Sequence, residues 1–279
     1  MRLERRLLYR SGFWEIARPR HPLTAGHILI RLSDPSTEFA QASASDWLFC
    51  HNLVRAALHD VLGATRFAVM FAHRWHPLGS AIGEPVAESS TPTFHLFGRW
   101  DGETTTPGAQ LSLPAHRRLG EPDHPLEATD AAVREALRRS RSEAAVSSGP
   151  QVGDAVVPAS DTSPPASDTS PPASDSSPLA SHPGPLARAV QTGPRHTVIE
   201  AVRPVASVRE ILPAELLAMG AVLAELPLGG GLSGFSCLAL ESETAGTPLR
   251  VHALGRSAAE VVNPLEDLLR SPEVSLALL

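Results

Sequence analysis

The sequence contains no lysine, and all 24 of its basic side chains are arginine. This absence excludes mechanisms that need a Schiff-base lysine or the lysine of a Walker-type phosphate loop. The two cysteines, Cys50 and Cys237, lie far apart in apolar segments, which favours buried thiols over a disulfide framework or a zinc clip. No uncharged apolar run reaches the length of about 18 residues that a membrane helix needs, and residues 1–10 carry charges where a signal peptide needs an apolar core. We therefore expect a cytoplasmic protein with no membrane partner.

A compositionally distinct tract spans residues 143–190. The motif Ala-Ser-Asp-Thr-Ser-Pro-Pro stands at 159–165, repeats at 166–172 and decays at 173–179. With almost no large apolar side chains, this tract cannot offset its chain entropy by burial. We therefore predict a disordered linker, acting as a spacer, between a first domain at 1–142 and a second, shorter domain at 191–279.

In each of the two segments on either side of this tract, the sequence predicts the order strand, helix, strand, loop and strand. In the first segment a helix begins near Ser43, a capping residue, and ends at Gly63. Two histidines on that helix, His51 and His59, are predicted to lie at the surface or at the boundary of the core. The other predicted elements are strands around Trp14 and at 28–32, 66–71, 196–202, 235–240 and 249–254, helices at 129–141 and 212–226, and a loop at 72–90. The sequence thus predicts an α+β fold of mostly antiparallel sheet crossed by one main helix in each half.

A strand carrying one histidine and closed by Gly-Arg occurs twice. It reads Thr91-Pro-Thr-Phe-His-Leu-Phe-Gly-Arg99 in the first half and Thr247-Pro-Leu-Arg-Val-His-Ala-Leu-Gly-Arg256 in the second. An earlier strand also opens on a histidine in each half, at His27 and His196. Such self-similarity is typical of an internal duplication. We expect the two halves to pair as a pseudo-dimer, in a protein that is a monomer or a homodimer.

These motifs resemble the histidine-triad superfamily. The early motif of that family, Pro-x-x-x-Gly-His followed by apolar residues, is similar to Pro22-Leu-Thr-Ala-Gly-His-Ile-Leu-Ile30. Its late motif, His-x-His-x-His-x-x-Pro-Arg, is similar to Thr91–Arg99, and Asp101-Gly-Glu follows where the family often has an acidic turn. The tandem arrangement resembles galactose-1-phosphate uridylyltransferase and dinucleoside tetraphosphate phosphorylase. The resemblance implies two modules of this fold and a nucleotide or nucleotide conjugate as the small-molecule ligand.

The resemblance also assigns the catalytic positions. Family members attack an α-phosphate with the central histidine of the late motif, and flanking histidines position that ring. His27 and His95 match the early position and the last position, whereas Thr93 stands at the position of the nucleophile. In the second half the nucleophile position falls on Arg250, and only His252 remains of the late motif. A threonine hydroxyl without an adjacent base is a poor nucleophile.

We therefore expect a nucleotide-binding or sugar-nucleotide-binding protein that lacks the usual covalent nucleotidyl-histidine catalysis. One alternative is an active nucleotide hydrolase or nucleotidyltransferase that uses His95 with His27 or His73. A second alternative is a scaffold without catalysis, whose two halves only present surfaces to partners.

Candidate phosphate contacts are Arg31, His73, Arg74 and Arg99, which stand at predicted strand ends. For each arginine the competing reading is a salt bridge or simple solvation. No metal and no cofactor is expected, because the pair formed by His73 and His76 lacks further ligands. The formal net charge of −6 argues against a nucleic-acid partner, which usually needs a basic patch.

Overall fold

One antiparallel β-sheet organises the part of the chain that the structure describes. The computed structural model describes residues 6–75, 92–113, 117, 126–147, 184–241, 248–257 and 260. Within these residues the sheet has nine strands, in the order β1-β2-β3-β5-β4-β8-β9-β7-β6. The strands are β1 (Leu7–Arg10), β2 (Trp14–Ala17), β3 (His27–Leu32), β4 (Arg66–His73), β5 (Thr93–Arg99), β6 (Ala187–Gly193), β7 (His196–Ala201), β8 (Leu232–Glu241) and β9 (Arg250–Ser257).

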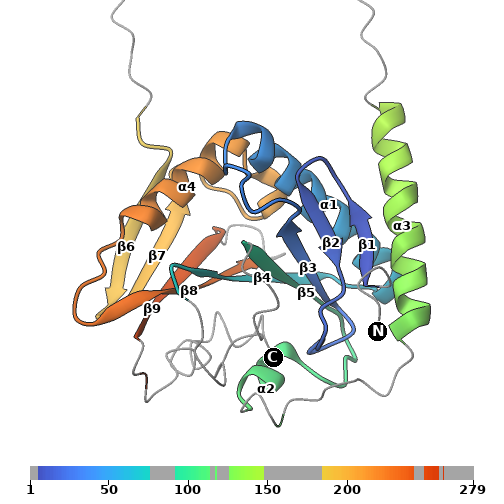
Figure 1. Ribbon diagram of the computed structural model, residues 1–279, viewed down its shortest axis with the longest axis horizontal. Coiled ribbons are helices and arrows are strands. Elements are labelled where there is room, and N and C mark those ends of the chain that lie inside the picture. Colours follow the sequence, from blue (N-terminus) through green and yellow to red (C-terminus); the bar gives the residue numbers. More distant parts are fainter. Residues whose placement is uncertain are drawn as a thin grey trace, which may run out of the picture.

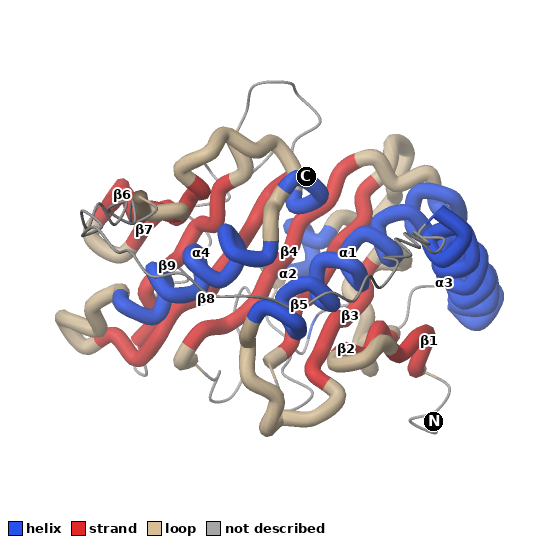
Figure 2. The backbone as a smooth tube through the Cα atoms, turned by 90° about the horizontal axis from the view of Figure 1, so that it is seen from above, coloured by secondary structure: helices blue, strands red, loops and turns tan. Residues whose placement is uncertain are grey.

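Two helices cover one face of this sheet. Helices α1 (Gln41–Leu62) and α4 (Pro213–Glu225) lie side by side on that face (Figures 1 and 2). The short helix α2 (Pro107–Leu111) lies on the opposite side of the sheet, and α3 (Leu126–Ser147) stands beside β1 (Figure 1). The 3₁₀ helix η3 (Val208–Glu210) precedes α4. The architecture is the α+β arrangement that the sequence predicts.

The start of α1 differs from the prediction by a few residues. Ala40, not Ser43, occupies the N-cap position, and the hydroxyl of Ser43 accepts a hydrogen bond from the Ala40 N–H at 2.8 Å. The Asp46 carboxylate accepts a hydrogen bond from the Phe13 N–H at 2.7 Å and so anchors the β1–β2 turn. The predicted end at Gly63 is confirmed, since this residue has a left-handed φ of 68°.

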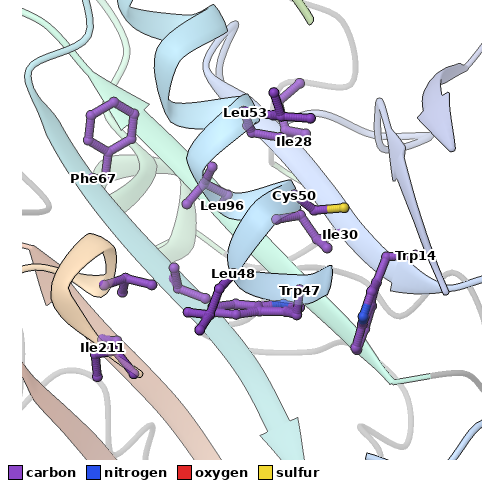
Figure 3. Packing of buried hydrophobic residues seen from close by; sticks show 14 of the residues in the cluster. Trp14, Ile28, Ile30, Trp47, Leu48, Cys50, Leu53, Phe67, Leu96 and Ile211 are labelled. Carbon is purple, nitrogen blue, oxygen red and sulfur yellow. The ribbon is translucent and has the colours of Figure 1, made fainter. Parts of the chain in front are cut away.

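The main hydrophobic core fills the space between α1, α4 and the sheet (Figure 3). Every second residue of a strand points to the same face, so β3 and β5 direct one set of side chains toward α1. Burying an aliphatic or aromatic side chain of this kind contributes about 1.5–3 kcal/mol. The residues labelled in Figure 3 include Ile28, Ile30, Trp47, Cys50, Leu53 and Leu96. This packing fixes which face of β3 and β5 turns away from the helices.

The opposite side of the sheet, which we call the histidine face, carries His27, His95, His196 and His252. In the central row across the sheet, His95 pairs with Met70, Met70 pairs with Leu238, and Leu238 pairs with His252. Directly paired residues of neighbouring strands point to the same side, so all four side chains lie on this face. A second, smaller apolar cluster consists of Leu23, Ala68, Met70, Phe97, Leu111, Leu238 and Leu254.

The two halves of the sheet meet where β4 pairs with β8. On one side of this seam the order is β4-β5-β3, and on the other it is β8-β9-β7. Met70 pairs with His95 just as Leu238 pairs with His252, so Met70 and Leu238 occupy equivalent positions. These two residues also pair with each other across the seam. The strand pairing of the first half is therefore repeated in the second half, and the two halves meet at the pair formed by Met70 and Leu238.

A buried charged network reinforces the seam on the helix side. Glu241 of β8 lies 2.8 Å from Nε2 of His51 and pairs with Arg55, both on α1. Its carboxylate also accepts a hydrogen bond from the Ser207 hydroxyl at 2.9 Å. Burial raises the pKa of Glu241, but these partners outweigh it and hold the pKa below the ordinary value. The prediction that His51 lies at the surface or the boundary is wrong, because its side chain is fully buried.

Regular structure extends slightly into the predicted linker from both ends. Helix α3 continues to Ser147, and β6 begins at Ala187. Residues 148–183, which include the whole Ser-Pro repeat, lie outside the described residues. Among the helices that the structure describes, none combines the length and the apolar character that a membrane crossing needs.

Candidate functional site

His27 and His95 contact each other at the centre of the candidate site. They come from the neighbouring strands β3 and β5, and Nε2 of His27 lies 3.0 Å from Nδ1 of His95. Gly26 allows the strands to approach this closely, and its carbonyl accepts a hydrogen bond from the Gly98 N–H at 3.0 Å. A Cβ atom on Gly26 would stand 2.2 Å from the Gly98 oxygen. The glycine of the Gly26-His27 motif thus allows the two imidazoles to lie side by side.

The backbone N–H of Leu23 determines the tautomer of both rings. It donates a hydrogen bond to Nδ1 of His27 at 3.1 Å, so this nitrogen must carry a lone pair. A neutral His27 then holds its proton on Nε2 and donates it to Nδ1 of His95. Nδ1 of His95 is the acceptor, and therefore its proton lies on Nε2. His95 offers an N–H donor at Nε2 and no lone pair there.

Burial keeps both imidazoles neutral. Desolvation holds the pKa of His27 well below its ordinary value, and the neighbouring His95 and Arg18 lower it further. Desolvation also lowers the pKa of His95 to about 4. His27 is fully buried, whereas His95 remains 9% exposed. His95 is therefore the member of the pair that a ligand can reach.

Arg18 positions the turn that leads into His27. Its guanidinium donates to the carbonyls of Ala25 at 2.7 Å and of His27 at 2.6 Å, and it pairs with Asp130 of α3. The Arg18 side chain is buried, and Asp130 supplies the counter-charge that a buried guanidinium needs. Helix α3 thereby supports the site although it contributes no residue to it.

Thr93 and Arg31 lie on the histidine face next to this pair. Thr93 is two residues before His95 on β5 and pairs with Arg31 on β3. The Arg31 guanidinium in turn contacts the Glu15 carboxylate at 3.0 Å, and Arg10 shares the same carboxylate. Two guanidinium groups around one carboxylate leave an excess of one positive charge at this end of the face.

The structure does not bring the other predicted phosphate contacts to His95. His73 ends β4 three residues beyond Met70, the partner of His95, so it lies about 10 Å further along the sheet on the alternate face. Arg74 follows with a positive φ of 54°. Arg99 lies on the histidine face but is only 1% exposed and pairs with Glu103. His76 and Thr91 lie outside the described residues.

A second histidine pair occupies the equivalent place in the other half. Nε2 of His196 on β7 lies 3.0 Å from Nδ1 of His252 on β9, and the two rings are tilted by 30°. The Gly255 N–H donates to the Arg195 carbonyl at 2.7 Å, as Gly98 does to Gly26. The candidate site residues chosen from the sequence all lie in the first half, so this contact was not predicted. The signal was present, because both halves carry one histidine on each of the two equivalent strands.

No family model and no curated protein matches this sequence. Among solved structures, the chain is similar to a uridylyltransferase at 20% identity and a TM-score of 0.36, over 49% of this chain and 44% of the other. It is also similar to a hypothetical histidine triad nucleotide-binding protein from Sulfolobus tokodaii strain 7, at 13% identity and a TM-score of 0.35, over 54% and 89% of the two chains. A zinc-bound histidine triad family protein from Mycobacterium smegmatis matches at 15% identity and a TM-score of 0.34, over 49% and 86%.

The two groups of proteins that the sequence motifs resemble are thus both among the matching structures. The chain spans less than half of the uridylyltransferase that it matches.

The described residues contain no cluster that would hold a metal ion. No three of their His, Cys, Asp or Glu side chains are arranged as a ligand set. In each histidine pair one ring nitrogen already contacts the other ring, which leaves a single nitrogen of His95 or of His252 for a ligand. These nitrogens are suited to single hydrogen bonds.

Proposed function

We propose that this protein binds a phosphate group of a nucleotide or sugar nucleotide through the Nε2–H of His95, and that it does not form a nucleotidyl-histidine. The observation that carries the proposal is the hydrogen bond from the Leu23 N–H to His27. Because of this hydrogen bond, the proton of His27 lies on its Nε2 and points to Nδ1 of His95. The proton of His95 then lies on Nε2, so the accessible ring nitrogen is a donor. A phosphate oxygen accepts such a hydrogen bond, and a donor aimed at an anion is worth about 1.5–3 kcal/mol.

The same hydrogen bonds disfavour catalysis by His95. An attack on phosphorus needs a lone pair on Nε2, and so the proton of His95 would have to move to Nδ1. His27 would then have to accept at Nε2 and carry its proton on Nδ1, where it would face the Leu23 N–H. Two donors facing each other in a buried site cost about 1–3 kcal/mol, the penalty of an unmade hydrogen bond. Thr93, at the nucleophile position, offers only a hydroxyl.

The duplicated architecture belongs to the same proposal. We infer that the chain consists of two histidine-triad-like modules, which pair through β4 and β8 as a pseudo-dimer and are linked by residues 148–183. The equal strand order on both sides of the seam and the two equivalent histidine pairs support this reading. A second half that completes the sheet would take the place of a partner subunit.

Titration of the full chain with AMP, ADP, dinucleoside polyphosphates and sugar nucleotides tests the proposal, with turnover followed by phosphorus NMR. We expect binding without turnover. His95→Ala should weaken binding by about tenfold to a hundredfold, which corresponds to one charge-assisted hydrogen bond. His59→Ala is the matched control, because this histidine is exposed on α1 and should not affect binding. Turnover that disappears in His95→Ala would instead establish the active enzyme, and binding of none of these ligands would favour the scaffold.

The tautomer assignment can be tested on its own. Long-range proton–nitrogen NMR spectra of the histidine rings distinguish a protonated nitrogen from one with a lone pair. His27 and His95 should both show protonation at Nε2 and a lone pair at Nδ1. A protonated Nδ1 on His95 would remove the argument against catalysis. Thr93→His would then be the informative variant, because it restores an imidazole at the nucleophile position.

A further inference from the structure

We propose that the second half holds a separate anion-binding site, in which His252 and Arg250 of β9 together bind a phosphate or carboxylate group. The proposal extends the function proposed for His95, yet it concerns different residues and can fail or succeed independently. It rests on the contact between His196 and His252, on the place of Arg250 beside it, and on the distance between the two histidine pairs.

The first observation is that the second pair repeats the geometry of the first. The contact runs from Nε2 of His196 to Nδ1 of His252 at 3.0 Å, the same atoms and the same distance as between His27 and His95. His252 is 7% exposed, close to the exposure of His95. The ring nitrogen left for a ligand is therefore Nε2 of His252, equivalent to Nε2 of His95.

The second observation is that the charge around this pair is arranged differently. Arg250 stands two residues before His252, at the position that Thr93 holds in the first half. Two residues on one strand are about 6.5 Å apart and point to the same face, so one anion can contact both side chains. In the first half, the nearest arginine of this face is Arg31 on the neighbouring strand, and a hydroxyl takes the place beside the histidine.

Arg250 shares the carboxylate of Glu200 with a second arginine. Glu200 of β7 lies 3.5 Å from Nε of Arg250, and Arg188 of β6 contacts the same carboxylate at 2.8 Å. Glu200 is thus shared between two guanidinium groups. A guanidinium has five N–H donors in a planar fork, so it can keep the contact with Glu200 and also bind an anion. The Arg250 side chain is 37% exposed and is thus accessible from solvent.

The third observation is that His196 is less enclosed than His27. His27 is fully buried, whereas the His196 side chain is only partly buried. At the turn before His196, the Thr192 hydroxyl donates to the His196 carbonyl at 3.1 Å instead of to the ring. The second pair is not held in one tautomer by a backbone N–H among the described residues. An anion beside Arg250 can therefore select the form with a proton on Nε2 of His252.

The two sites are too far apart to be one. His95, Met70, Leu238 and His252 stand on four successive strands, which separates the two histidines by about 14 Å. The buried side chains of Met70 and Leu238 fill the space between them on the same face. A single phosphate cannot span this distance, so the full chain should bind two.

Titration of the full chain with inorganic phosphate tests this inference, with the ring signals of histidine followed by NMR at constant ionic strength. We expect the signals of His95 and of His252 both to shift. Arg250→Gln should weaken the response of His252 by at least about tenfold, because one charged contact is lost, and leave that of His95 unchanged. The His95 response also reports that the variant is folded. Arg188→Gln removes charge from the same cluster without removing the group beside His252, and should have the smaller effect.

The outcomes separate the two proposals. A shift of His95 without any shift of His252 would overturn the second site and leave the first in place. A shift of His252 that is equally strong in Arg250→Gln would also overturn it, since the guanidinium would then play no part. A shift of His252 alone would support the second site and overturn the role proposed for His95.

Discussion

Mild acidification should destabilise this protein, because buried histidines, His95 and His252 among them, resist protonation. Burial lowers the pKa of both His95 and His252 from 6.5 to about 4. In the unfolded chain each ring takes up its proton near the ordinary value, so acid favours the unfolded state. The stabilising contribution is complete above about pH 6.5 and is lost as the pH falls toward about 4. The full loss is about 3 kcal/mol for each ring, from 1.36 kcal/mol per pKa unit.

The magnitude at an accessible pH follows from the same values. Between about pH 7.5 and about pH 5, each ring should remove about 2 kcal/mol from the free energy of unfolding. Two carboxyl groups act in the opposite direction, since burial raises the pKa of Glu103 and Glu260. A comparison of variants at each pH is therefore more informative than the wild-type curve alone.

Urea unfolding at both pH values, followed by tryptophan fluorescence, measures this effect. His95→Gln removes the titrating group while keeping an N–H donor, and its loss of stability on acidification should be about 2 kcal/mol smaller than that of the wild type. His252→Gln should behave in the same way. If His95→Gln and the wild type lost equal stability between the two pH values, the assignment of His95 as a buried neutral ring would be wrong.

Three further predictions concern stability and reactivity. Gly26→Ala should destabilise the protein by about 2 kcal/mol or more in urea unfolding, because the new Cβ would meet the Gly98 oxygen at 2.2 Å. Glu241→Gln should cost about 3 kcal/mol in the same assay, since it leaves the Arg55 charge of the seam without its carboxylate, and an unchanged midpoint would refute this. Cys50 is fully buried and its pKa is raised to about 12, so a thiol reagent should label it only after unfolding, and rapid labelling of Cys50 in the native protein would contradict its placement.

The sequence motifs were sufficient to predict the first histidine pair. They did not show on which face of the sheet the other candidate phosphate contacts lie. Gly26 allows the close approach of β3 to β5, whereas Gly98 leaves room for the Leu58 side chain of α1. His73 was linked to the site through its position after a strand. Because side chains alternate along a strand, and β4 continues to His73, that residue falls on the other face.

Other features left little signal in the sequence. Strand β6 exposes five successive residues from Arg188 to Thr192, so it shows no alternation between buried and exposed positions. His51 was misplaced because its partner, Glu241, lies 190 positions later in the chain, on a strand of the other half. Burial of a polar side chain by so distant a partner depends on the tertiary fold and cannot be derived from local pattern.

The pairing of β4 with β8 has a consequence for a truncated chain. Met70 and Leu238 occupy equivalent positions and face each other, so β4 meets a strand that copies its own pairing pattern. A fragment containing only the first half would expose β4 as an open edge, complementary to the same edge of another molecule. Such a fragment should self-associate through Met70 at rising concentration. The covalently attached second half therefore also prevents the first half from dimerising through this edge.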